Sequence, residues 1–136
     1  MGGKLRVAVA DDERPARAFL LKLLERFDNV LVVGAAGSGD EALELIEREA
    51  PDLLLLDVHM PGLDGFGVVH MLNGAPRPLI AFVTAFEEYA DLATEVGAIG
   101  YLHKPICADD LATTLDRAQE RLIHIDAAAD MVARRG

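Results

Sequence analysis

Five polar residues that lie far apart in the chain each follow a run of apolar residues. They are Asp11, Asp12, Asp57, Thr84 and Lys104. The apolar runs are typical of strands, and stretches with helical periodicity separate them. In an open parallel sheet the carboxyl ends of the strands meet at one edge, in the crevice where ligands bind. Three carboxylates, a hydroxyl and an ammonium at one edge suit a divalent cation and a phosphoryl group, so the spacing predicts a site that holds both.

Asp57 is the candidate nucleophile of this site. It follows four consecutive leucines, a pattern typical of a central parallel strand that is covered on both faces. A carboxylate held at the end of such a strand can attack phosphorus and form an aspartyl phosphate. The structural alternative is a helix or turn cap, but the convergence of two further acids on Asp57 favours a chemical role.

Asp11 and Asp12 are the candidate metal ligands beside Asp57. Three neighbouring carboxylates repel one another and raise each other's pKa unless a cation lies between them. Mg²⁺ prefers oxygen ligands and is typically held by one or two carboxylates together with phosphate oxygens. Taken alone, Asp12 also suits an ordinary helix N-cap. A ring nitrogen of His59 is a poor ligand for this ion, which favours oxygen.

Lys104 and Thr84 are the candidate partners of the phosphoryl oxygens. Pro105 restricts the backbone of Lys104 and permits a cis bond, which would direct the lysine into the site. The ammonium can pair with a phosphoryl oxygen or, when none is present, with Asp57. The Thr84 hydroxyl can donate a hydrogen bond to such an oxygen. Outside this context, each is also an ordinary surface lysine or strand-end threonine.

The elements that position these residues alternate along the chain. Apolar runs predict strands at residues 5–10, 30–35, 53–57, 79–83 and 99–102, and helical spacing predicts helices at 15–27, 40–49, 66–73, 86–96 and through 111–132. This order predicts an α/β fold of the flavodoxin-like (βα)₅ type, a doubly wound parallel five-stranded sheet with right-handed crossovers. The same spacing predicts that Phe19, Phe27, Phe66, Phe82 and Met71 pack in the core.

Length and composition limit the classes of function. The chain has 136 residues, 51% hydrophobic and 26% charged, as expected for one globular domain. A net charge of −10 disfavours direct binding of nucleic acid. No apolar run is long enough to span a membrane, and the N-terminus lacks the pattern of a secretory signal. The single cysteine, Cys107, excludes an intrachain disulfide and suits a reducing compartment, so we expect a cytoplasmic protein without membrane partners.

The last helix carries more apolar positions than packing on its own sheet requires. Steps of four and three residues join Leu111, Leu115, Ala118, Leu122, Ile125, Ala129 and Val132. This is a heptad pattern over three repeats, of which about half would serve a helix that covers its own sheet. We therefore divide the chain into a domain at residues 4–123 and a helical extension or linker at 124–136. The extension forms a homodimer seam, leads into a further domain, or is a frayed alanine-rich tail.

The motifs together resemble a known family. They are Asp11-Asp12, Asp57 with Met60-Pro61 and Asp64-Gly65 after it, Thr84-Ala85 and Lys104-Pro105. The pattern resembles the receiver domain of two-component response regulators over residues 4–123. Within that family, residues 83–90 and 100–105 are similar to receivers coupled to LytTR-type DNA-binding domains.

The resemblance implies a role for each site residue. Asp57 would accept a phosphoryl group from a phosphohistidine on a sensor histidine kinase, in a Mg²⁺-dependent step. Asp11, Asp12 and Asp57, with the backbone carbonyl of His59, would hold the metal. Thr84 and Lys104 would bind the phosphoryl oxygens.

The resemblance also implies a switch and an output. Movement of Thr84 would be coupled to inward rotation of Tyr101, a bistable element biased by a local change of charge. The output would be control of transcription through a DNA-binding domain outside this chain. Such a protein assists its own phosphorylation and dephosphorylation but is not a turnover enzyme.

Three other interpretations compete with this one. Residues 37–42 match the dinucleotide-binding pattern G-x-G-x-x-A, but a nicotinamide enzyme would leave Asp11, Asp12, Thr84 and Lys104 unexplained. A phosphohydrolase with an aspartate nucleophile would carry a second acid at position 59, where this chain has histidine. A receiver-like module that binds without phosphorylation would not need the complete set of site residues.

Overall fold

The structure is a computed structural model that describes residues 3–135. Five strands and five helices alternate in the order β1 (Leu5–Ala10), α1 (Arg14–Leu24), β2 (Val30–Ala36), α2 (Gly39–Glu49), β3 (Leu53–Asp57), α3 (Gly65–Leu72), β4 (Leu79–Thr84), α4 (Ala90–Glu95), β5 (Gly100–His103) and α5 (Ala108–Arg135). All strand pairs are parallel, and the strand order is β2-β1-β3-β4-β5. The predicted (βα)₅ fold is therefore confirmed.

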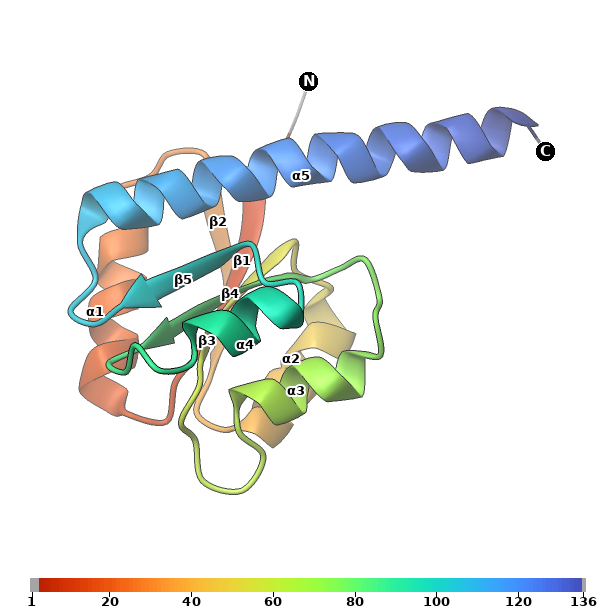
Figure 1. Ribbon diagram of the computed structural model, residues 1–136. Helices are drawn as coiled ribbons and strands as arrows, with labels where there is room; N and C mark the ends of the chain where they lie inside the picture. The colour runs from red at the N-terminus through yellow and green to blue at the C-terminus, as the bar shows by residue number, and fades with distance from the viewer. Residues whose placement is uncertain (1–2, 136) are drawn as a thin grey trace.

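Helices cover both faces of the sheet (Figure 1). Helices α1 and α5 share one buried apolar cluster with alternate strand residues, and α2, α3 and α4 share the other. In β3, Leu53 and Leu55 belong to the first cluster, whereas Leu54 and Leu56 belong to the second. A strand has a side-chain period of two, so its successive residues face opposite sides. This explains why the central strand is apolar throughout.

The segment that matches the dinucleotide pattern forms a helix cap. The Ser38 hydroxyl accepts a hydrogen bond from the Glu41 N–H at 3.1 Å, and the Glu41 carboxylate accepts one from the Gly37 N–H at 3.0 Å. Ser38 is therefore the N-cap of α2, and the Glu41 carboxylate reaches back to the N–H of the residue before that cap, a variant of the capping box. A Cβ atom added to Gly39 would lie 2.2 Å from the Leu63 carbonyl oxygen, so close backbone packing requires this glycine.

Two core assignments and two helix boundaries were wrong. Helix α1 ends at Leu24 instead of residue 27, because the chain turns there and the Phe27 N–H donates to the Leu24 carbonyl only three residues back. Phe19 is 52% exposed and Met71 is 61% exposed, because the buried stripes of α1 and α3 are narrow and both residues lie at the margin of their stripe. Phe82 is fully buried, and Phe27 and Phe66 are half-buried against the core. Helix α4 begins at Ala90 instead of residue 86, since hydrogen bonds hold the preceding segment in an irregular loop.

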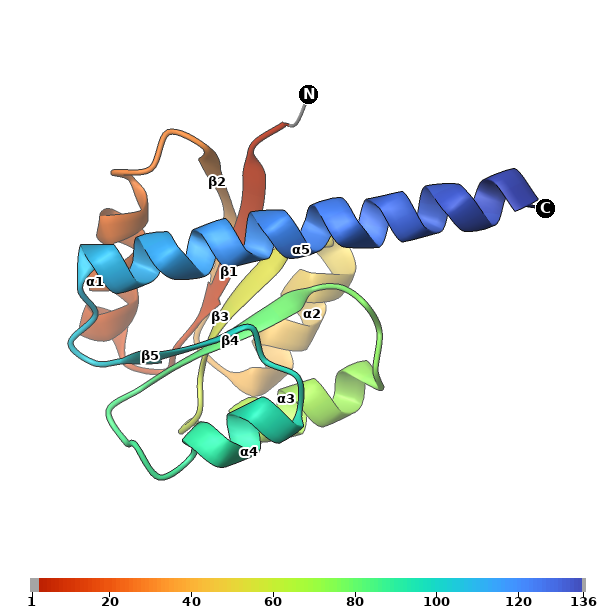
Figure 2. The ribbon, with the colours of Figure 1, turned by 45° about the horizontal axis from the view of Figure 1, so that its top comes forward.

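Helix α5 extends beyond the sheet that it covers (Figures 1 and 2). Its 28 residues correspond to a length of about 42 Å. Leu111, Leu115 and Ala118 are buried, whereas Ala129 and Val132 are exposed. The heptad pattern therefore divides into a half that packs on the sheet and a half that does not. No helix within residues 3–135 has the combined length and apolar character needed to cross a membrane.

Candidate functional site

The sheet topology brings all five predicted site residues to one edge. Asp11 follows β1, Asp57 ends β3, Thr84 ends β4 and Lys104 follows β5. The strand order reverses between β1 and β3, which is where open α/β sheets place their ligand crevice. Asp11, Asp57 and Thr84 are each buried by at least 95%. Asp12 and Lys104 are more exposed, so the edge is a prearranged polar site with a buried floor that opens to the surface.

Three carboxylates form the acidic part of the site. One carboxylate oxygen each from Asp11, Asp12 and Asp57 lies within 4.8 Å of the others. The Glu13 N–H donates to Asp11 Oδ1 at 2.9 Å and holds this carboxylate in place. A set of hard oxygen donors with this spacing fits a cation such as Mg²⁺.

Lys104 supplies the positive charge of the site. Its Nζ lies 2.8 Å from Asp11 Oδ2 and 3.7 Å from Asp57 Oδ2. The Lys104 N–H donates to the Thr84 carbonyl at 2.8 Å, and the Lys104–Pro105 peptide bond is cis, as the sequence suggested. Burial alone would lower the pKa of Lys104, but the hydrogen bond to Asp11 and the charges of Asp57, Asp11 and Glu13 outweigh it. The pKa of Lys104 is therefore raised.

The environment strongly affects the ionisation of Asp57. Burial, followed by the negative charge of Asp11, raises the pKa of Asp57 from 3.8 to about 7, against the opposing effect of Lys104. A raised pKa is expected for a buried acid among other acids with one cation nearby. The site therefore favours an added positive charge.

Hydrogen bonds link Thr84 to Tyr101 through the backbone of Phe86. The Phe86 N–H donates to Thr84 Oγ1 at 3.2 Å, which leaves the threonine's own hydrogen available to another acceptor. The Tyr101 hydroxyl donates to the Phe86 carbonyl. Tyr101 is half-buried and also packs against the second apolar cluster. A shift of the Thr84 side chain would thus reach Tyr101 through one intervening residue.

Sequence reasoning missed two charged neighbours of the site, Arg17 and Glu13. The Arg17 guanidinium donates to the Asp11 carbonyl at 2.6 Å, and the Glu13 carboxylate lies 3.7 Å from Lys104 Nζ. The spacing of these two residues, four apart at the start of a helix, was the available signal. The ring of His59 lies 4.7 Å from that of Phe86 and 5.2 Å from that of Tyr89, so an aromatic cluster borders the site.

Comparisons with known proteins give a consistent result. A family described as "Response regulator receiver domain" matches residues 7–116. The chain is 44% identical over 117 residues to the positive alginate biosynthesis regulatory protein of Pseudomonas aeruginosa, covering 84% of this chain and 47% of that protein. It is 40% identical over 116 residues to the transcriptional regulatory protein BtsR of Salmonella typhimurium, covering 85% and 48%. The chain thus spans about half the length of these curated relatives.

Solved structures agree with the sequence matches. The signal receiver domain of the putative response regulator NarL from Mycobacterium tuberculosis superposes with a TM-score of 0.78 at 34% identity. That match covers 87% of this chain and 98% of the other. A response regulator receiver domain protein from Clostridium thermocellum gives a TM-score of 0.79 at 28% identity, covering 88% and 98%.

Proposed function

Because the chain belongs to the receiver domain family of response regulators, we propose that Asp57 is its phosphoacceptor in two-component signal transduction. Phosphorylation-dependent signalling is the standard role of this family. One observation carries the assignment of the residue. Asp57 is a buried strand-end carboxylate that lies within 4.8 Å of the oxygens of Asp11 and Asp12 and 3.7 Å from the Lys104 ammonium.

The proposed reaction is a transfer between a nitrogen and an oxygen. An ionised Asp57 oxygen attacks the phosphorus of a phosphohistidine, a P–O bond forms, and the P–N bond breaks. The departing imidazole nitrogen keeps the bonding electron pair and takes up a proton. Asp11, Asp12, Asp57 and the backbone carbonyl of His59 would hold Mg²⁺, which when bound neutralises charge on the phosphoryl oxygens.

Lys104 and Thr84 complete the proposed mechanism. The ammonium, which pairs closely with Asp11 and more distantly with Asp57, moves to a phosphoryl oxygen, and the Thr84 hydroxyl donates to another. This movement of Thr84 lengthens its bond with the Phe86 N–H, and Tyr101 follows because its hydroxyl is bound to the Phe86 carbonyl. The switch that we propose therefore consists of Thr84 and Tyr101.

A groove beside the site supports a protein as phosphodonor. It has a volume of about 410 Å³, and Asp11 and Lys104 line it together with apolar side chains that include Pro15, Phe19 and Ile106. The half-exposed Phe19 offers an apolar contact to a partner that reaches Asp57 from this side. We propose that a sensor histidine kinase docks here. The single cysteine, Cys107, suits a reducing compartment, so we place this exchange in the cytoplasm.

We propose that the output lies outside this chain. Relatives that are about twice as long are named as regulatory or transcriptional regulatory proteins, which supports control of transcription through a further domain, of LytTR type on the sequence resemblance. The net charge of −10 argues against contact of this chain with nucleic acid. The chain would act as a phosphoacceptor and not as a turnover enzyme. In this view residues 4–123 are the receiver, and 124–136 are its helical extension.

Intact-mass analysis after incubation with acetyl phosphate tests the phosphoacceptor. We expect one added phosphoryl group that requires Mg²⁺ and is lost in Asp57→Asn. Asp116→Asn, a change at an exposed acid on α5, is the matched control and should retain the adduct. Absence of an adduct, together with no binding of beryllofluoride, would instead support a receiver-like module that acts without phosphorylation.

A homodimer is a second proposal, which the exposed half of the heptad pattern favours. Ala129 and Val132 continue the seam beyond the sheet, and within residues 3–135 they are exposed and belong to neither apolar cluster. Light scattering of the full chain and of a chain that ends at Arg121 distinguishes a dimer formed through the extension from a monomer. We expect a dimer only in the full chain, and a monomer in both would refute the idea.

A further inference from the structure

An arginine joins the sheet to the exposed part of α5, at the edge opposite the acidic site. Arg77 lies in the loop between α3 and β4, between Pro76 and Pro78, whose rings restrict the local backbone. Its guanidinium lies 3.8 Å from Asp52 Oδ1 and forms a hydrogen-bonded ion pair with Asp126 of α5. The Arg77 side chain thus contacts Asp52 and Asp126, two acids that are 74 residues apart in the sequence.

Asp52 is a rigid anchor for this arginine. Its Oδ2 accepts a hydrogen bond from the Arg6 N–H at 2.9 Å, and its own N–H donates to the Arg6 carbonyl at 2.8 Å. Its carbonyl accepts from the Leu79 N–H at 2.9 Å. These bonds tie Asp52 to β1 and β4 at the point where β3 begins. The charge that Arg77 contacts therefore belongs to the body of the sheet.

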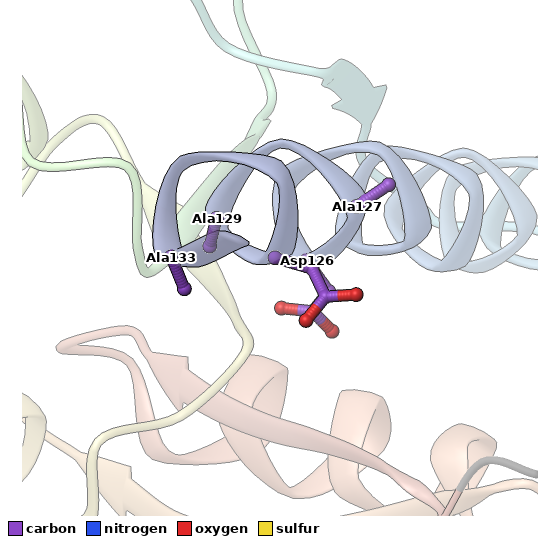
Figure 3. Close-up of a pocket in the computed structure, with 5 residues that line it drawn as sticks. Asp126, Ala127, Ala129 and Ala133 are labelled. Carbon is purple, nitrogen blue, oxygen red and sulfur yellow. The ribbon is translucent and has the colours of Figure 1, made fainter. Parts of the chain in front are cut away.

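Asp126 marks the point at which α5 leaves the rest of the molecule. Ile125 still packs against the core, but residues 126–135, here called the overhang, are all exposed. Figure 3 shows Asp126 together with Ala127, Ala129 and Ala133, whose methyl groups offer no polar contact. Asp130 pairs with Arg134 at 3.3 Å within the same helix. Among the described residues of the overhang, Asp126 is therefore the one with an ion pair to the body.

We propose that the Arg77–Asp126 ion pair is a latch that fixes the direction of the overhang relative to the sheet. An exposed ion pair contributes little to global stability, but here it opposes only a swing of a helix end that has few other contacts. Strands β3 and β4 begin next to Asp52 and Arg77 and end at Asp57 and Thr84, so the latch lies at the far end of the two strands that enter the acidic site. The latch does not depend on the phosphoacceptor proposal, because its contacts all lie at the opposite edge.

Distances between two spin labels test the latch. The labels are attached at Glu44→Cys on α2 and Ala133→Cys on the overhang, in the full chain with Cys107→Ser. Both chosen positions are exposed. We expect one narrow distance distribution in the parent protein. Arg77→Ala and Asp126→Asn should each broaden the distribution. The population at the native distance should fall by up to about fivefold relative to the populations at other distances, as expected for an interaction of this size.

Two further measurements separate the latch from a general structural effect. The distance distribution of the double variant should be no broader than that of either single variant, because both substitutions remove the same interaction. Salt at 1 M, where the screening length is about 3 Å, should broaden the parent distribution and leave the variants unchanged. Asp130→Asn, which removes the ion pair within α5, is the matched control and should keep the narrow distribution. The latch is refuted if both single variants keep the narrow distance distribution, or if Asp130→Asn broadens this distribution as much as they do.

Discussion

Lys104 is closer to Asp11 than to Asp57. Its ammonium lies 2.8 Å from Asp11 Oδ2 and 3.7 Å from Asp57 Oδ2, so its direct contact is with a proposed metal ligand and not with the proposed nucleophile. This arrangement leaves an oxygen of Asp57 less engaged than those of Asp11. It also means that cation binding and phosphoryl binding both compete with the same ion pair.

Lys104→Met should lower the free energy of unfolding. The change removes the ammonium that pairs with the buried acids Asp11 and Asp57, and breaking a charged hydrogen bond of this kind costs about 1.5–3 kcal/mol. The loss should be larger at pH 8 than at pH 5, because Asp57 is ionised at the higher pH. Urea denaturation at both pH values provides the measurement, and Lys22→Met at an exposed position of α1 is the control. Equal losses in the two variants would contradict the prediction.

Asp57→Asn should stabilise the protein near neutral pH. The folded-state pKa of Asp57 is raised to about 7 from an ordinary value of 3.8, chiefly by burial. A group with a raised folded pKa contributes stability below its unfolded pKa, and this contribution is lost as the pH rises through the folded pKa. The variant should therefore gain at least about 1 kcal/mol over the parent at pH 8, the equivalent of one pKa unit, and nothing at pH 3.5. A gain independent of pH would show that the carboxylate charge is not the cause.

Mg²⁺ should stabilise the protein, and more weakly as the pH falls. Binding to the folded state alone raises stability by mass action, and the ligands must be ionised. One unit below its pKa an acid is only about one-tenth ionised, so the apparent affinity should fall by roughly tenfold between pH 8 and pH 6. Thermal shift against Mg²⁺ concentration measures this. Asp12→Asn should weaken binding at both pH values, whereas Asp116→Asn should not; identical titrations would exclude Asp12 as a ligand.

Phe86→Ala should shorten the lifetime of a phosphoryl group on Asp57. The Phe86 ring packs on His59 beside the site, and its removal opens a path for the water that attacks phosphorus. The backbone bonds from Phe86 to Thr84 and Tyr101 do not depend on its side chain. Decay of the phosphorylated mass over time is the readout. Leu92→Ala, at an exposed apolar residue on α4, serves as the control, and an unchanged decay in Phe86→Ala would mean that the ring does not limit water.

Gly39→Ala should destabilise the fold by about 1–3 kcal/mol, the usual cost of forcing extra volume into a packed region. The new methyl group would lie 2.2 Å from the Leu63 carbonyl oxygen, a backbone atom that cannot move without displacing the loop. Gly3→Ala is the matched control, because apart from its chain neighbours no described atom lies within 4 Å of its added methyl group. Chemical denaturation compares the free energies of unfolding of the two variants. An unchanged value for Gly39→Ala would show that the loop with Leu63 shifts to accommodate the methyl group.

The sequence was sufficient to predict the order of strands and helices and the residues that meet at the acidic edge. The spacing of apolar residues identified the strands, because successive side chains of a strand face opposite sides of the sheet and each side is either covered by helices or exposed to solvent. The predicted strand ends then placed Asp11, Asp57 and Thr84 at the same edge of the sheet before any distance between them was known. This follows because the carboxyl ends of parallel strands lie at one edge. The boundaries of β1 and β3 agree with the predicted ones to the residue. These features depend on patterns that are local along the chain.

Other features depend on contacts between distant segments, and only the tertiary structure decided them. Periodicity placed Phe19 on the apolar face of its helix, but the width of the covered stripe depends on the neighbours of α1, and Phe19 is exposed. The preference of Lys104 for Asp11 depends on a difference of less than 1 Å between loops from different strands. The pairing of Arg77 with Asp126 requires a loop and a helix that are 49 positions apart. Local sequence patterns do not contain these distances, because packing of the whole chain sets them.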